Sequence, residues 1–265
     1  MKQFLKKQKY HLISICSFLF VLLVWELCTD VLHLISPMML PSPAKIFSTL
    51  VYKLKGGTNP DGATLFQNIW ASLKIALGGY AVGVLIGVPL GVGMAWSRRF
   101  ELFTKPLFDI IRPIPPLAWI PLSILWFGLG DQSKFFIIFL GCFTFITVNT
   151  YDGARNVDPE LMGAARMLGA SERQVFFRIV LPSSVPYIFA GLQIAVTAGW
   201  SAVVGAEMVR SDEGVGWMIV RGMNTGNTLQ IMVGMVAIGI IGFLLATLTS
   251  ALERRLCAWN EQKGM

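Results

Sequence analysis

The chain has 265 residues, of which 54% are hydrophobic and 14% are charged, and its net charge is +7. A soluble domain of this length carries charge on about a quarter of its residues. The composition therefore excludes an ordinary soluble protein and predicts that much of the chain faces lipid or other helices. The basic residues lie in short clusters between long apolar runs, which is typical of membrane topology and argues against a nucleic-acid partner.

Six apolar segments are long enough to cross a membrane, which takes about 20 residues of helix. We therefore predict an all-α membrane protein in a single domain, residues 1–265. The expected spans are about 11–35, 66–97, 103–129, 133–151, 184–209 and 228–252. The first run is too long for a signal peptide and is expected to remain as a span. Four prolines between positions 113 and 121 predict that the third span kinks or breaks.

The distribution of Lys and Arg predicts the orientation. If the N-terminus is cytoplasmic, most of the basic residues outside the spans fall in the inner segments. This asymmetry favours cytoplasmic N- and C-termini. The four cysteines have no metal-ligand spacing, so we predict no metal site and interpret them as small buried side chains. They are Cys16, Cys28, Cys142 and Cys257.

Two stripes of small residues predict close packing of helices, within the subunit and between subunits. The first has a glycine every four residues in the second span, and the second lies in the fifth span. Their members are Gly79, Gly83, Gly87 and Gly91, and Gly191, Ala195 and Gly199. The outer segment before the second span predicts an amphipathic helix that Ser42 caps and Pro43 begins.

The inner segment between the fourth and fifth spans carries signals for two short helices. Asp158 can cap the first helix, and Gly169 can end it in the left-handed conformation. Ser171 and Gln174 can form a capping box for the second helix, which we expect to stop at Pro182. Because its centre consists of small residues, the first helix can seat in a groove on another protein or rest on the membrane as a surface hairpin.

This inner segment, residues 152–183, resembles the coupling motif of permeases in binding-protein-dependent ABC importers. The family pattern has Glu where this chain has Gly163, and the other fixed positions match. The resemblance implies that coupling to an ATPase involves Gly163, Ala164, Ala165, Leu168, Gly169, Ile179, Leu181 and Pro182.

Further stretches are similar to the nitrate, sulfonate and taurine branch of these permeases. They are Leu40–Pro43, Arg112–Leu122, Trp126–Gly130, Ala206–Met208 and Gly214–Gly216. The resemblance covers about residues 37–255 and implies a type I ABC importer permease fold in the bacterial inner membrane. It also implies a permease dimer, two ATPase subunits that carry ATP and Mg, and an extracytoplasmic binding protein. The expected solute is a small anion such as a sulfonate, taurine or nitrate.

Enzymatic activity is not expected, because the sequence lacks the G-x-x-x-x-G-K-[ST] phosphate loop and any visible catalytic constellation. The chain itself is therefore predicted to bind no cofactor. The main alternative is a secondary transporter or channel that needs no ATPase. Such a protein would need coupling-ion sites and usually a repeated half, and we find no internal repeat.

Several polar and aromatic residues inside the spans are candidates for the translocation path. Arg112 either lines the path, where it would favour anions, or extends to the inner surface. Glu207 contacts the path, pairs with a neighbouring chain or caps a glycine-rich turn at residues 214–216. Trp119 and Trp200 either line the path or anchor the chain at the membrane interfaces, and Asn149 is expected to hydrogen-bond between helices.

Overall fold

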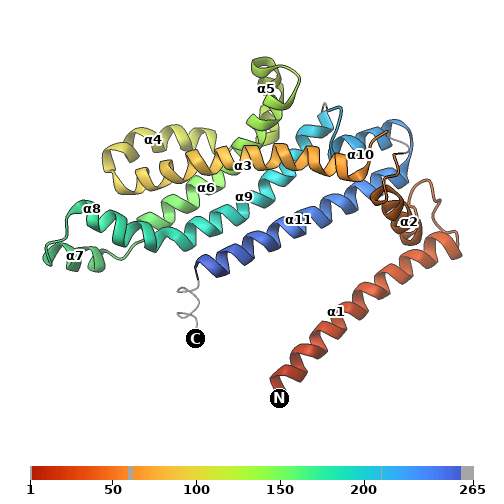
Figure 1. Cartoon of the computed structure of the whole chain (residues 1–265), viewed down its shortest axis with the longest axis horizontal. Coiled ribbons are helices and arrows are strands. Elements are labelled where there is room, and N and C mark those ends of the chain that lie inside the picture. The colour runs from red at the N-terminus through yellow and green to blue at the C-terminus, as the bar shows by residue number, and fades with distance from the viewer. Residues whose placement is uncertain (1, 59–61, 210, 258–265) are drawn as a thin grey trace. The chain divides into compact units, whose positions relative to one another are not determined.

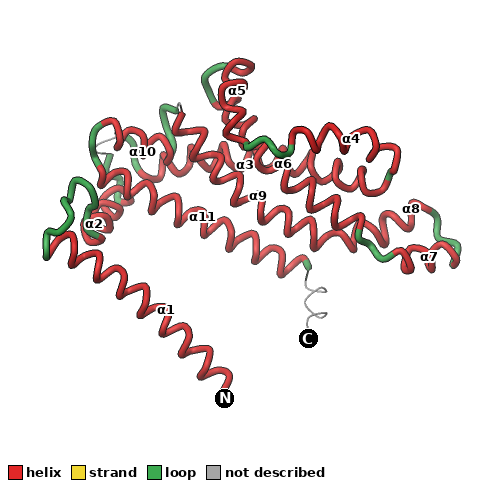
Figure 2. Tube along the Cα trace, turned by 180° about the vertical axis from the view of Figure 1, so that it is seen from behind, coloured by secondary structure: helices red, strands yellow, loops and turns green. Residues whose placement is uncertain are grey.

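The computed structural model describes residues 2–58, 62–209 and 211–257, and its regular elements in these ranges are helices without a strand. The all-α class is thus confirmed (Figures 1 and 2). The chain divides into two compact units, one of residues 1–69 and 218–237 and the other of residues 70–217 and 238–265. A single domain over residues 1–265 stays a prediction, and residues 258–265 lie outside the described part.

Five helical segments are long and apolar enough to cross a membrane, and a bent pair of helices raises the number to six. Their bounds lie close to the six predicted spans. The long segments are α1 (Lys2–Glu26) with the π turn Leu27–Val31, α3 (Leu65–Trp96), α6 (Asp131–Arg155), α8 (Glu172–Val175) with α9 (Leu181–Val209), and α11 (Thr228–Leu256). The shorter helices α2 (Pro43–Leu54), α7 (Pro159–Met167) and α10 (Val215–Asn224) connect them.

The third predicted span is the bent pair. Its first half, α4 (Arg98–Ile111), ends directly before the proline cluster. A 3-10 turn at Pro116–Trp119 then leads into α5 (Ile120–Phe127), and the second half leaves the first at an angle of 84°. Prolines lack the N–H group and clash with the preceding turn, so a helix cannot run straight through the cluster. The predicted break is confirmed.

In the first unit, the start of α2 is held by α1 rather than by its own cap residue. Ser42 occupies the cap position, as predicted, but its side chain makes no capping bond within the described residues. The Glu26 carboxylate accepts the hydrogen bond of the Ala44 N–H at 3.1 Å instead. A negative charge at this end also complements the helix dipole. Lys45 of α2 forms an ion pair with Asp30, which ties the two segments together a second time.

In the second unit, the glycine stripe of α3 packs against α6. A methyl group added to any of the four glycines would lie 2.6–3.0 Å from an atom of α6, which is closer than such atoms normally approach. The nearest atoms belong to Ile138 for Gly79, Cys142 for Gly83, Ile146 for Gly87 and Thr147 for Gly91. Glycine is therefore what allows these two backbones to approach.

The stripe of α9 packs against a neighbouring face of α6, which shares Ile138 and Cys142 with the contact to α3. A methyl group on Gly191 would lie 2.7 Å from Asn149, and one on Gly199 would lie 2.5 Å from the sulfur of Cys142. Ala195 between them is fully buried. These contacts lie within one chain, and the expected role of the stripes between subunits stays a prediction. Helix α6 is therefore the centre of the unit, and five of its residues have no exposed surface: Ile138, Cys142, Ile146, Thr147 and Thr150.

Candidate functional site

The hairpin formed by α7 and α8 has the caps that its sequence predicts. The Asp158 carboxylate accepts a hydrogen bond from the Glu160 N–H at 2.9 Å. Gly169 has φ +85°, the left-handed conformation that ends a helix most easily at glycine. Ser171 and Gln174 form the reciprocal capping box, with bonds of 2.8 and 3.3 Å. A side chain thus caps the start of each helix, and a glycine in the left-handed conformation begins the loop between them.

The second helix of the hairpin does not stop at Pro182, and that prediction is wrong. A π turn, Phe176–Val180, joins α8 directly to α9, and the Leu181 N–H bonds to the carbonyl of Phe176. The wider turn accommodates the proline ring without ending the helix. The hairpin is therefore continuous with the span that follows it.

The inner side of the hairpin packs on a small apolar cluster. Buried Val157, Val175 and Val180 form its centre, and Met162 and Ala165 of α7 pack against them. An ion pair outside the cluster joins the two helices, because the Arg166 guanidinium donates to both oxygens of Glu172, at 2.7 and 3.1 Å. These hydrogen bonds, and then the negative charge of Glu172, raise the pKa of Arg166 above its usual value. The apolar cluster on the inner side and the ion pair outside it thus hold the two helices of the hairpin together.

The outer side of α7 is exposed and apolar. Met167 and Leu168 are 86% and 88% exposed, and Leu161 is half exposed. A methyl group on Gly163 would have no atom of the described residues within 4 Å, so the absent Glu leaves an open surface there. Contiguous exposed apolar side chains mark a protein interaction site. Our sequence reasoning placed Leu161 on the apolar face of this helix but counted neither Leu161 nor Met167 among the coupling residues, although both lie at helical spacing from the motif.

Five of the predicted coupling residues fall into two groups. Ala164, Leu168 and Pro182 are exposed, as a docking surface requires. Ala165 and Ile179 instead pack on the apolar cluster and hold the hairpin in shape. Leu181 is half-buried at the start of α9.

Glu207 caps α10 and is buried, with 1% of its surface exposed. Its two carboxylate oxygens accept hydrogen bonds from the Ser72 hydroxyl at 2.7 Å and from the Gly216 N–H at 2.8 Å. The Ser72 oxygen in turn accepts the N–H of Val215 at 2.9 Å. The first N–H groups of a helix lack intrahelical partners and favour a negative charge, so this arrangement satisfies them. Glu207 thus caps the glycine-rich turn, which is one of the interpretations given to it from the sequence.

Gly214 leaves the space that this cap needs. Its φ is +114°, and a methyl group on it would lie 2.4 Å from the carboxyl carbon of Glu207. Ser72 is the partner that our sequence reasoning missed. A single serine in an apolar helix, far from Glu207 in the sequence, gives no local sign of this pairing.

The other path candidates have different surroundings and do not meet in one place. Trp200 is buried and donates its indole N–H to the carbonyl of Ile238 at 3.0 Å, so it joins α9 to α11. Trp119 packs edge to face on Phe136 with ring centroids 6.2 Å apart. The Asn149 amide donates to the carbonyl of Phe145 at 2.8 Å, within its own helix and not between helices as predicted.

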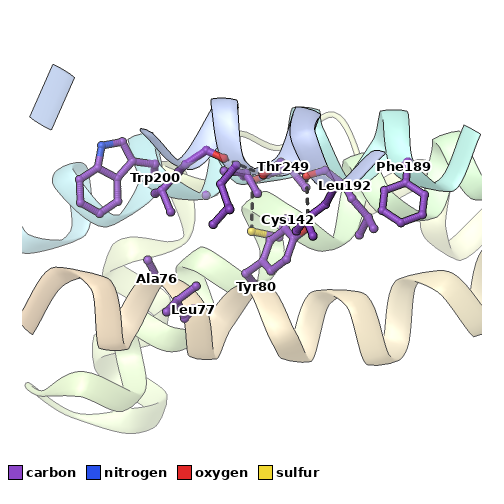
Figure 3. Close-up of a pocket in the computed structure, with 14 residues that line it drawn as sticks. Ala76, Leu77, Tyr80, Cys142, Phe189, Leu192, Trp200 and Thr249 are labelled. Atoms are coloured by element: carbon purple, nitrogen blue, oxygen red, sulfur yellow. Dashed lines mark hydrogen bonds between the residues drawn. The ribbon is translucent and has the colours of Figure 1, made fainter. Parts of the chain in front are cut away.

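Two cavities of the second unit differ in polarity. The first, ≈ 220 Å³, lies among α3, α6, α9 and α11, and its lining is almost wholly apolar (Figure 3). Its polar groups already have hydrogen-bond partners within the protein. The Tyr80 hydroxyl donates to the carbonyl of Leu192 at 3.3 Å, and the Cys142 thiol lies 3.4 Å from the carbonyl of Ala195. A charged solute would lose its hydration there without compensation. The second cavity, ≈ 100 Å³, lies between α4 and α6 and is lined by charged residues that include Arg112.

Comparison with known families identifies the chain. Residues 83–258 match the sequence model of the binding-protein-dependent transport system inner membrane component family. The chain belongs to this family. It is therefore a permease, the membrane-embedded transport subunit of an ABC importer, and the resemblance found in its motifs is confirmed.

Individual relatives match three quarters or more of the permease. The taurine transport system permease protein TauC of Escherichia coli (strain K12) is 35% identical, over 94% of this chain and 90% of the relative. The nitrate import permease protein NrtB of Leptolyngbya laminosa is 34% identical, over 75% of this chain and 71% of the relative. A crystal structure of the MetNI methionine ABC transporter in an inward-facing conformation aligns with a TM-score of 0.63 and 20% identity, over 71% of this chain and 94% of that one.

These similarities confirm the type I ABC importer permease fold and the location in the bacterial inner membrane as a multi-pass protein. The permease works with an ATPase and a binding protein, as importers of this family do. The orientation of its termini stays a prediction.

Replacing Ser72 by alanine tests the buried cap. The Glu207 oxygen and the Val215 N–H would each lose a buried hydrogen bond, at a cost of about 1–3 kcal/mol each. We expect a clearly lower midpoint in thermal unfolding of the purified permease in detergent. The matched control is Ser201→Ala, because Ser201 is exposed and bonds only within its own helix. Equal midpoints for the two variants would contradict the assignment.

Proposed function

We propose that two copies of the permease enclose one translocation path, with an ATPase subunit on each hairpin and an extracytoplasmic binding protein that delivers the solute. A single chain offers few polar groups for a conduit, because Trp200 and Glu207 are engaged in packing or capping. A second copy would contribute a second set of wall helices. ATP and Mg would be bound by the ATPase subunits, since the permease has no phosphate loop.

The exposed apolar side of α7 is the observation that carries the docking proposal. With its termini in the cytoplasm, the permease would present this surface to the ATPase. The caps, the Arg166–Glu172 ion pair and the apolar cluster hold the hairpin together as a rigid piece. Its unbroken connection through the π turn would carry ATPase movement directly into α9. ATP binding would then favour one of two packed states of the spans.

The proposed solute is a small oxyanion, with a sulfonate as the preferred class. The named relatives support it, because one is a taurine permease and another a nitrate permease. Arg112 supports it independently, because it places a fixed positive charge in a cavity beside the broken third span. A charge at this position needs a partner or water. A passing anion would be a transient partner.

Replacing Leu168 by glutamate tests the docking surface. An unpaired charge in an apolar interface should weaken ATPase binding by at least about 2 kcal/mol, roughly 30-fold. Co-purification of the ATPase with the tagged permease measures this loss. The control is Leu54→Glu, which places the same charge on the exposed end of α2. Normal co-purification with the Leu168 variant would count against docking on α7.

Replacing Arg112 by glutamine tests the anion proposal. We expect uptake of taurine into reconstituted vesicles, with the cognate binding protein, to fall about tenfold through loss of a charge-assisted contact. Arg99→Gln removes the same charge from the exposed start of α4 and should leave uptake unchanged. Unchanged uptake in the Arg112 variant would remove this residue from the path. A binding protein that prefers a neutral or cationic compound would overturn the choice of solute.

A further inference from the structure

The cavity between α4 and α6 combines charges of both signs on two facing helices. Lys105, Asp109 and Arg112 recur at helical spacing and so share one face of α4. Tyr151 and Asp152 contribute from α6. One water molecule needs a cavity of about 10–15 Å³. A volume of ≈ 100 Å³ therefore has room for a solute of several heavy atoms.

Two of these charges already have partners. The Lys105 ammonium lies 3.1 Å from the Asp109 carboxylate and 5.4 Å from the centre of the Tyr151 ring. The Tyr151 hydroxyl is also engaged, because it donates to the carboxylate of Glu101 at 2.6 Å. These groups, which line one side of the cavity, therefore already have ion-pair or hydrogen-bond partners within the protein.

The other two charged residues of the cavity, Arg112 and Asp152, have no such partners in the described part of the chain. Among the described residues, neither Arg112 nor Asp152 makes an ion pair or a side-chain hydrogen bond, with each other or with a third group. Both line the same cavity, one from the end of α4 and one from α6. Both residues are exposed, and the cavity is therefore lined by one cation and one carboxylate that have no ion-pair partner among the described residues.

The remaining wall is apolar and held firmly in place. Met94, Phe108 and Val148 line it. Phe108 is buried and packs edge to face on Phe143, with ring centroids 5.7 Å apart, which fixes α4 against α6. A short hydrocarbon linker would fit such a wall better than water does.

We propose that this cavity binds a small zwitterion, with its ammonium on Asp152, its oxyanion on Arg112 and its carbon linker on the apolar wall. The inference rests on the proposed function, an oxyanion importer, and narrows the solute class to oxyanions that also carry an ammonium group. Charge-assisted hydrogen bonds at both ends would discriminate against ligands with one charge, because such ligands leave one of the two residues unpaired.

Two classes of ligand carry both an ammonium group and an oxyanion. The first is an amino-sulfonate solute that reaches the cavity from the inner side, where the start of α4 and the end of α6 are predicted to lie. The second is the ethanolamine phosphate headgroup of a membrane lipid. Both carry an ammonium and an oxyanion on a two-carbon linker.

Equilibrium binding of labelled taurine to the permease–ATPase complex, without binding protein, tests the proposal. The complex is placed in nanodiscs of phosphatidylglycerol, which has no ammonium group. Taurine should bind at least about tenfold more tightly than ethanesulfonate or ethylamine. Asp152→Asn should abolish this preference. Asp212→Asn removes the same charge from an exposed loop position outside the cavity and should preserve it.

A second arm distinguishes the sources. If the lipid headgroup is the occupant, native mass spectrometry should show phosphatidylethanolamine retained over phosphatidylglycerol by the wild type and lost in Asp152→Asn. Either result supports a zwitterion site. The proposal is overturned if taurine shows no preference that depends on Asp152 and the lipid arm shows none either. Uptake of taurine with the cognate binding protein in that case would leave the proposed function standing.

Discussion

The close approach of three helix backbones in the second unit is the constraint on which the rest of this permease depends. In lipid there is little hydrophobic force between helices, so their association relies on packing and on contact between small residues. The stripes of α3 and α9 supply these contacts on two neighbouring faces of α6. A single added methyl group at Gly79 or Gly199 would already collide with α6.

The functional parts are attached to this packed centre. Helix α6 carries Asp152 at the charged cavity and leads through Val157 into the hairpin, while α9 receives the hairpin at its start. At the other end of α9, Glu207 fixes the beginning of α10. A displacement of the hairpin would therefore be transmitted along helices whose mutual position is already set, which is the condition for a rigid-body switch between two packed states.

Local signals made most of the fold predictable. Apolar length predicted the spans, the proline cluster predicted the break in the third, and Asp158, Gly169 and Ser171 predicted the hairpin caps, because each effect acts within a few residues. What the sequence could not indicate depends on distant partners. Ser72 and Glu207 meet only after folding, and the π turn before Pro182 leaves no simple sequence signal. The same holds for the cavity charges, whose lack of partners is a property of the folded chain.

Disulfide formation between Gly83→Cys and the native Cys142 tests the central packing most directly. The other three cysteines would first be replaced by serine. A Cβ atom at position 83 would lie 3.0 Å from the Cβ of Cys142, so the two helices must separate by about half an ångström to reach the spacing of about 3.5–4.5 Å found in disulfides. Oxidation should give an intrachain bridge, identified by mass spectrometry of the monomer, whereas Gly239→Cys on the open side of α11 should give none. A bridge between two chains, or none at position 83, would contradict the account.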